Sequence, residues 1–143
     1  SHHNDSNIYM SLHLTSSHLT HAPLRLFKSL SMSSVCSISS FKHSRLLKCK
    51  SLSPSIKTGA LFSSPLPPDF VSQAEKVKAD EVHLRYDTCT TDKVREAKNA
   101  GFGVMAWFRG PLSMLCDSEG WDDAGNEDED MYRIVMGTGV DTV

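Results

Sequence analysis

Two arginines and a tryptophan stand at the ends of short apolar segments, and their chemistry suits a phosphate ester. Arg85 lies near the end of residues 82–86, while Trp107 and Arg109 lie at the end of residues 104–108. A guanidinium group presents a planar fork of N–H donors that matches phosphate oxygens. An indole offers an apolar wall to an alcohol or glycerol group. We therefore take Arg85, Trp107 and Arg109 as candidate substrate-binding residues.

The same three residues have a simpler interpretation. Trp107 could belong to the core of a barrel, and the two arginines could pair with the acidic residues 117–130. If Trp107 points inward, then Met105 and Arg109 do so as well, because alternate residues of a strand share a face. The sequence leaves both interpretations open.

Four apolar segments, alternating with helical patterns, must position these side chains. Strands are predicted at residues 57–62, 82–86, 104–108 and 140–143, and the chain stops within the last of them. The helices between them begin near Pro67-Pro68, at Thr90 or Thr91, and near Glu127. Alternating strands and helices favour a parallel sheet. The predicted fold class is α/β, an incomplete (β/α)8 barrel that holds the last four strands with their intervening helices.

The periodicity of apolar side chains in one strand and one helix predicts which of their residues are buried. In residues 82–86 we expect Val82, Leu84 and Tyr86 to face the covering helix, and His83 and Arg85 to face the opposite way. The opposite face would be solvent in an open sheet and the interior in a closed barrel. In the last helix the expected buried stripe is Met131, Ile134 and Val135.

Residues 1–55 have a different composition from the rest of the chain. Residues 1–68 contain 18 of the 21 serines and a formal charge of +6, whereas residues 69–143 carry −8. We predict a disordered, Ser-rich basic segment at residues 1–55 and a partial barrel at 56–143. Three interpretations of the segment remain open: a transit peptide, a stretch with no role, or a structural element.

The cysteines and the transit-like composition bear on location. Cys36, Cys49, Cys89 and Cys116 show no C-x-x-C spacing, so we expect reduced thiols in an intracellular protein. A plastid would be the location if the Ser-rich segment is a transit peptide. No apolar run reaches the ~18 residues of a membrane span, and scattered cations do not favour nucleic acid as a partner.

Other motifs do not support a cofactor site in this chain. Residues 101–106 match G-x-G-x-x-A, but a helix precedes them and a strand follows, which is the reverse of a dinucleotide site. The acidic residues 117–130 do not match a calcium loop, and the histidines of residues 1–43 lack nearby ligands at metal spacing. We expect no cofactor in this chain.

Several segments in order resemble the C-terminal part of glycerophosphodiester phosphodiesterases, which belong to the phospholipase-C-like phosphodiesterase barrels. The matching segments are residues 82–94, 97–101, 104–107 and 139–141. Thr90, Asp92 and Val94 match the family's T-x-E-x-V helix start, with Asp in place of Glu. The resemblance implies that Trp107 lines the substrate pocket, and that Asp141 is the Asp of G-V-D.

The resemblance also shows what this chain does not contain. The family's His-Arg-Gly strand, its paired acidic metal ligands and its second catalytic histidine have no counterpart, and His43-Ser44-Arg45 is not a substitute. Gly110 stands where the family commonly has Asn. Complete members are expected to use a divalent cation, Mg²⁺ or Ca²⁺, to hydrolyse a glycerophosphodiester to glycerol 3-phosphate and an alcohol.

These observations support three hypotheses. The first is a fragment of a glycerophosphodiester phosphodiesterase that is inactive alone, whose parent takes a glycerophosphodiester substrate. The second is a non-catalytic half-barrel that associates through open strand edges. The third is an unrelated α/β protein, in which no pocket would form around Trp107.

Overall fold

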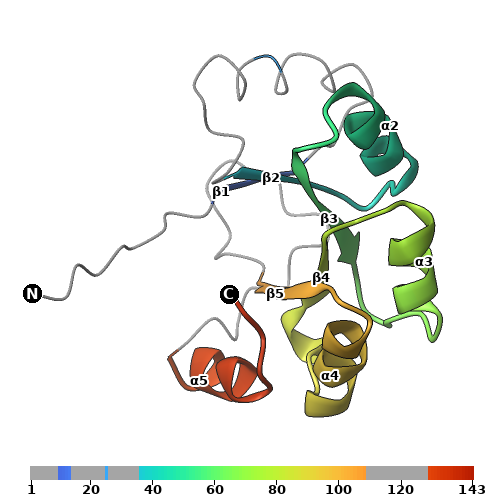
Figure 1. The fold of residues 1–143 in the computed structure, drawn as a ribbon. Coiled ribbons are helices and arrows are strands. Elements are labelled where there is room, and N and C mark those ends of the chain that lie inside the picture. Colours follow the sequence, from blue (N-terminus) through green and yellow to red (C-terminus); the bar gives the residue numbers. More distant parts are fainter. Residues whose placement is uncertain (1–9, 14–24, 26–35, 109–128) are drawn as a thin grey trace, which may run out of the picture. The chain divides into compact units, whose positions relative to one another are not determined.

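The computed structural model describes residues 10–13, 25, 36–108 and 129–143 (Figure 1). The strand order is β1-β2-β3-β4-β5, which is also the order of the sequence. The chain divides into two compact units, one of residues 1–61 and 72–81 and the other of residues 62–71 and 82–143. The α/β class with parallel strands and intervening helices, predicted from the sequence, is confirmed.

The first unit is built on three parallel strands. They are β1 (Met10–His13), β2 (Cys36–Ser40) and β3 (Lys57–Phe62), whose last residue belongs to the second unit. β1 pairs with β2 in register Leu12↔Ile38, and β2 pairs with β3 in register Ile38↔Thr58. Helix α2 (Ser44–Leu52) connects β2 to β3 and buries Leu46 and Cys49. A strand–helix–strand crossover of this kind is what parallel pairing requires.

The structure differs from the expected disorder of residues 1–55 at residues 36–52, which form β2 and α2. All five residues of β2 are buried, including Ser37, Ser39 and Ser40. The Ser40 Oγ accepts a hydrogen bond of 3.1 Å from the Lys42 N–H, so a buried serine can be satisfied locally. Serine content therefore misled the prediction, because small hydroxyl side chains fit inside this sheet.

An aspartate clamp holds the beginning of β3 in the first unit. The Asp80 carboxylate accepts hydrogen bonds from the Thr58 N–H (2.7 Å) and, more weakly, from its Oγ1 (3.3 Å). The Asp80 N–H in turn donates to the Thr58 carbonyl (2.9 Å). The Lys50 ammonium, in the last turn of α2, lies 2.6 Å from the same carboxylate and also donates to the Ile56 carbonyl (2.8 Å). Asp80 thus joins a helix end to the start of a strand.

The elements of the later sequence lie close to their predicted positions. They are α3 (Phe70–Lys76), β4 (Glu81–Arg85), the short 3-10 helix η2 (Tyr86–Thr88), α4 (Thr91–Asn99), β5 (Gly103–Trp107) and α5 (Glu129–Gly137). Helix α3 begins at Phe70, after the Pro67-Pro68 pair, and the Phe70 N–H bonds to the Pro67 carbonyl. The prolines therefore form the turn that precedes the helix.

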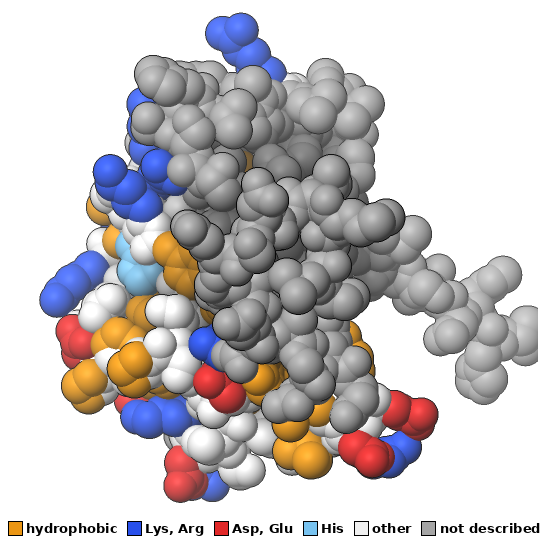
Figure 2. All heavy atoms as spheres, turned by 180° about the vertical axis from the view of Figure 1, so that it is seen from behind, with side chains coloured by type: hydrophobic (Ala, Val, Ile, Leu, Met, Phe, Trp, Pro, Cys, Tyr) orange, Lys and Arg blue, Asp and Glu red, His pale blue; other side chains and the backbone are white. Residues whose placement is uncertain are grey.

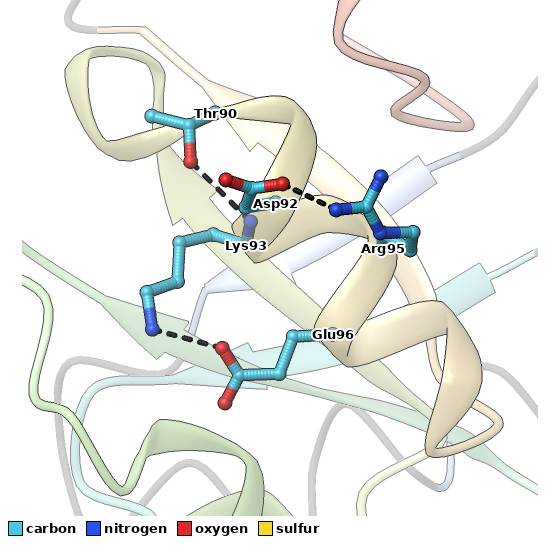
Figure 3. Close-up of polar contacts among 5 residues, drawn as sticks. All are labelled: Thr90, Asp92, Lys93, Arg95 and Glu96. Atoms are coloured by element: carbon cyan, nitrogen blue, oxygen red, sulfur yellow. Dashed lines mark hydrogen bonds and ion pairs between the residues drawn. The ribbon is translucent and has the colours of Figure 1, made fainter.

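Figure 3 shows the polar contacts at the start and on the exposed face of α4. Thr90 is the N-cap, and its hydroxyl accepts a hydrogen bond of 3.3 Å from the Lys93 N–H. On the exposed face Asp92 pairs with Arg95, and Lys93 pairs with Glu96 at 2.8 Å. Gly101, with φ +90°, follows the helix in a conformation that favours glycine. The cap and the glycine were both predicted.

Helix α5 buries a narrower stripe than the sequence predicted. Val135 is 1% exposed, but Ile134 is 64% exposed, so the prediction that Ile134 is buried is wrong. Met131 is half-buried. Val135 is the one fully buried residue of α5, so the buried stripe of this short helix is narrow and Ile134 lies outside it. The segment after α5 reaches β5 through one parallel bridge, Met105↔Thr142.

A second aspartate clamp occurs in the second unit with the same three components. The Asp141 carboxylate accepts a hydrogen bond of 2.8 Å from the Val104 N–H, and the Asp141 N–H donates to the Val104 carbonyl at 2.8 Å. The Lys98 ammonium, in the last turn of α4, lies 2.7 Å from the carboxylate. Each clamp therefore joins a lysine at a helix end, the start of the following strand, and an aspartate that precedes either β4 (Asp80) or the Thr142 bridge (Asp141).

The clamp at Asp80 predicts a stability effect. Replacing Asp80 with Ala removes a charge-assisted hydrogen bond to a part-buried N–H, and each such bond contributes about 1.5–3 kcal/mol. Since the Asp80 side chain is 40% exposed, we expect a loss near the lower end, about 1.5 kcal/mol, in urea unfolding. Asp92→Ala, which removes an exposed ion pair, is the control and should cost about 0.5 kcal/mol. Equal losses for the two variants would contradict the clamp.

Candidate functional site

Trp107 is fixed at the end of β5 by a hydrogen bond from its ring. The indole Nε1–H donates to the carbonyl of Phe62, the last residue of β3, at 3.1 Å. Burial alternates along β5: Val104 and Ala106 are each 1% exposed, whereas Met105 and Trp107 are half-buried. Met105 and Trp107 therefore share the face opposite the one that is fully buried, as predicted. The hydrogen bond connects the C-terminal ends of two parallel strands, where barrel sites form.

Arg85 ends β4, and its side chain is largely buried, with 14% exposed. Its Nε lies 3.3 Å from an oxygen of Asp87, and its guanidinium lies 5.6 Å from the centre of the Tyr86 ring. One acidic partner is thus a close neighbour in sequence. A guanidinium carries five N–H donors in a planar fork.

Three aromatic rings pack beside these residues, and sequence reasoning did not identify them as a group. Tyr86 stacks on Phe108 with ring centres 4.9 Å apart and planes 10° apart. Phe108 in turn contacts Tyr132 of α5 at 4.7 Å. The available signal was the position of Tyr86 and Phe108 directly after strands, because aromatic residues there can meet at one edge of a sheet. The stack gives the site a rigid apolar side.

His83 and Cys89 are both buried. His83 is 1% exposed, so the face of β4 opposite the helix is interior rather than solvent at this position. Burial, followed by the charge of Asp87, raises the pKa of the Cys89 thiol to about 12. That thiol is protonated at neutral pH and is a poor nucleophile. Cys36, Cys49 and Cys89 are free thiols, as predicted.

Several candidate groups lie outside the described residues. These are Arg109, Cys116 and the acidic residues up to Asp128. Among the residues that the structure does describe, no group of three His, Cys, Asp or Glu side chains could hold a metal ion. Within that same part of the chain, no helix is both long and apolar enough to cross a bilayer.

Asp141, the Asp of the G-V-D match, has its carboxylate in the second clamp and not beside Trp107. Burial alone would raise its pKa, but hydrogen bonds from Lys98 and Val104 and the charge of Lys98 lower the pKa below its ordinary value. Its contacts are those of a group that stabilises the junction of α4, β5 and the last segment.

Comparisons with known proteins identify the fold through structure alone. No family model and no curated protein matches the sequence. A solved protein from Galdieria sulphuraria, assigned as a glycerophosphodiester phosphodiesterase, aligns with a TM-score of 0.75 and 24% identity. The alignment covers 94% of this chain and 52% of that one.

Two further structures agree with it. A phosphodiesterase from Oleispira antarctica, solved with its product sn-glycerol-3-phosphate, gives a TM-score of 0.70 at 20% identity, covering 96% of this chain and 51% of that one. The glycerophosphodiester phosphodiesterase of Thermotoga maritima gives 0.59 at 17% identity, covering 94% and 52%. This chain has the fold of about half of such a barrel. The half-barrel fold thus agrees with the resemblance found in the sequence.

The lowered pKa of Asp141 predicts how stability depends on pH in this half-barrel. Because the folded-state pKa lies below the ordinary 3.8, the clamp stabilises fully above pH 3.8 and loses this contribution as pH falls through the folded value. We expect Asp141→Asn to flatten the acid limb of a plot of unfolding free energy against pH. Lys98→Gln, which removes the cation, should flatten it in part. An unchanged acid limb in both variants would show that the clamp does not couple to pH.

Proposed function

We propose that this chain is part of a glycerophosphodiester phosphodiesterase and contributes one side of its glycerol phosphate site. The observation that carries the proposal is the anchoring of Trp107 by Phe62 at the C-terminal ends of β5 and β3, within a fold that matches the solved phosphodiesterases over 94% of the chain. One of those relatives was solved with sn-glycerol-3-phosphate. The parent reaction is the hydrolysis of a glycerophosphodiester to glycerol 3-phosphate and an alcohol.

Each side chain has a role that follows from its chemistry. The indole of Trp107 forms an apolar wall for the carbon atoms of the glycerol unit, and its hydrogen bond to Phe62 keeps the ring orientation fixed. The guanidinium of Arg85 binds phosphate oxygens, and Arg109 is the second expected donor. Phosphate must compete with Asp87 for Arg85, because both are anions at neutral pH. These residues bind and orient a substrate.

The chemical step needs groups that the described residues do not supply. Complete relatives are expected to use a divalent cation with histidines, but the described residues contain no group that fits a metal. The buried Cys89 thiol, whose pKa is raised to about 12, is unsuited to nucleophilic attack. We therefore assign no catalytic residue, and the isolated chain is a binding part of the enzyme.

The binding role is tested by titration of the full chain with sn-glycerol 3-phosphate, followed by calorimetry or NMR shifts. We expect saturable binding that weakens at least tenfold in Arg85→Gln, since a hydrogen bond to a charged group contributes about 1.5–3 kcal/mol. Arg95→Gln is the control, because Arg95 is an exposed arginine that pairs with Asp92 on α4. No turnover of glycerophosphocholine is expected with Mg²⁺ or Ca²⁺.

The turnover assay and the binding assay test two different claims. Clear turnover by the isolated chain would contradict its inactivity. Equal binding by the wild type and Arg85→Gln would contradict the phosphate site.

A second candidate function belongs to another class: a non-catalytic module that pairs with a second copy through open strand edges. The observation that favours it is the apolar exposure around the last helix. Ile134 is 64%, Met136 45% and Val143 44% exposed. Apolar side chains beside a strand that makes a single bridge provide a surface suited to association.

Light scattering during size-exclusion chromatography tests this association. We expect a dimer in the wild type and a monomer in Ile134→Glu, because a charge on the contact surface would have to be desolvated. Leu47→Glu, in an exposed apolar residue of α2, is the control and should remain dimeric. A wild-type monomer at every concentration would reject the module.

A further inference from the structure

The outward surface of α2 and the turns next to it combines apolar side chains with cations, and the Asp80 carboxylate lies beside it on Lys50. Phe41, Leu47 and Leu52 are 45%, 41% and 38% exposed. Lys42 and Lys48 are exposed beside them. Residues 36–68 contain five cations and no Asp or Glu. In a chain with a net charge of −2, this concentration of positive charge is local.

A groove lies on the same unit and has the same mixed character. It has a volume of about 550 Å³ and is lined by Leu47, Lys50, Ser51, Pro54 and Lys78. Leu47 and Pro54 supply apolar walls. Lys78 is exposed, and Lys50 is held in place by Asp80 and the Ile56 carbonyl. A group that fills this groove would have both an anionic part and a hydrocarbon part.

We propose that this surface, the α2 face, docks onto an anionic lipid bilayer, with a lipid phosphate between Lys50 and Lys78 and the leucines at the acyl boundary. Exposed leucine and phenylalanine side chains would remain in water on a surface that binds only nucleic acid, so the apolar residues favour lipid. Lysines beside them are attracted to anionic headgroups, each contributing about 1 kcal/mol near the membrane surface. In Figure 2 the upper left of the described surface shows blue and orange side chains together.

This docking is separate from the glycerol phosphate site. It uses the first unit, whereas Arg85 and Trp107 belong to the second unit. Its chemistry is reversible adsorption without a covalent step. The same surface would hold the chain near phosphate esters that lie at a membrane.

Vesicle flotation of the full chain tests the proposal. We expect binding to vesicles of phosphatidylcholine with about one third phosphatidylserine, and little binding to phosphatidylcholine alone. Raising the salt concentration should weaken binding, because exposed charges are screened within about 10 Å at 0.1 M salt. Lys48→Gln/Lys78→Gln should lower the partition coefficient at least tenfold, as follows from about fivefold per cation.

Two further variants separate the apolar from the electrostatic contribution. Leu47→Ser/Leu52→Ser should also weaken binding severalfold, which a purely electrostatic attraction would not predict. Arg95→Gln/Arg133→Gln removes two exposed cations of α4 and α5 and should bind as the wild type. Circular dichroism confirms that each variant is folded.

Three results would overturn the proposal. They are equal binding to neutral and anionic vesicles, equal loss in the Arg95→Gln/Arg133→Gln control, and tighter binding to a DNA duplex than to anionic vesicles at the same salt. The last would assign the surface to nucleic acid.

Discussion

The aspartate clamp is the interaction on which the rest of this structure depends. A parallel strand has an unpaired N–H where it begins, and a helix that runs back to it ends in unpaired carbonyls. Asp80 and Asp141 each accept a hydrogen bond from the N–H of a strand residue and donate their own N–H to the carbonyl of that residue. Each also pairs with a lysine of the helix that precedes that strand. The aspartate side chain thereby connects the end of a helix to the beginning of the strand that follows that helix. The recurrence of this arrangement in both compact units suggests that it is a solution to the parallel fold and not an accident of one loop.

The two clamps lie at one end of their strands, and the candidate binding residues lie at the other end. They act at the beginnings of β3 and β5, where they provide stability, so the opposite ends are available for binding. At those ends the Trp107 indole donates to Phe62 and the Tyr86–Phe108–Tyr132 stack supplies an apolar side. Rings held by packing and by a hydrogen bond lose little freedom when a ligand arrives. Rings fixed in this way would suit the substrate-binding role that we propose for Trp107, although the described residues carry no metal-ligand group.

The sequence predicted the second half of the chain well because its signals are local and redundant. The apolar run at residues 104–108, the Thr90 cap and Gly101 after α4 each defined an element without knowledge of the rest. β2 was missed because three of its five residues are serines, and composition outweighed the apolar residues Cys36 and Ile38. The site was only partly predictable. Arg85 and Trp107 could be placed at strand ends, but the Phe62 carbonyl and Tyr132 are partners that only the tertiary fold brings near.

Lys50 shows how stability and surface chemistry can depend on one residue. Its ammonium lies 2.6 Å from Asp80 and donates to the Ile56 carbonyl, so it is part of the first clamp. The same side chain lines the groove next to Lys78. A lysine that is already held in place loses less conformational entropy when an anion binds than an unrestrained lysine would. Asp80 reduces the charge of Lys50, whereas residues 36–68 contain five cations and no Asp or Glu, so positive charge remains on α2 and its turns. The clamp therefore places a cation in the groove at a reduced entropic cost, and any anion bound there would in turn depend on the integrity of the clamp.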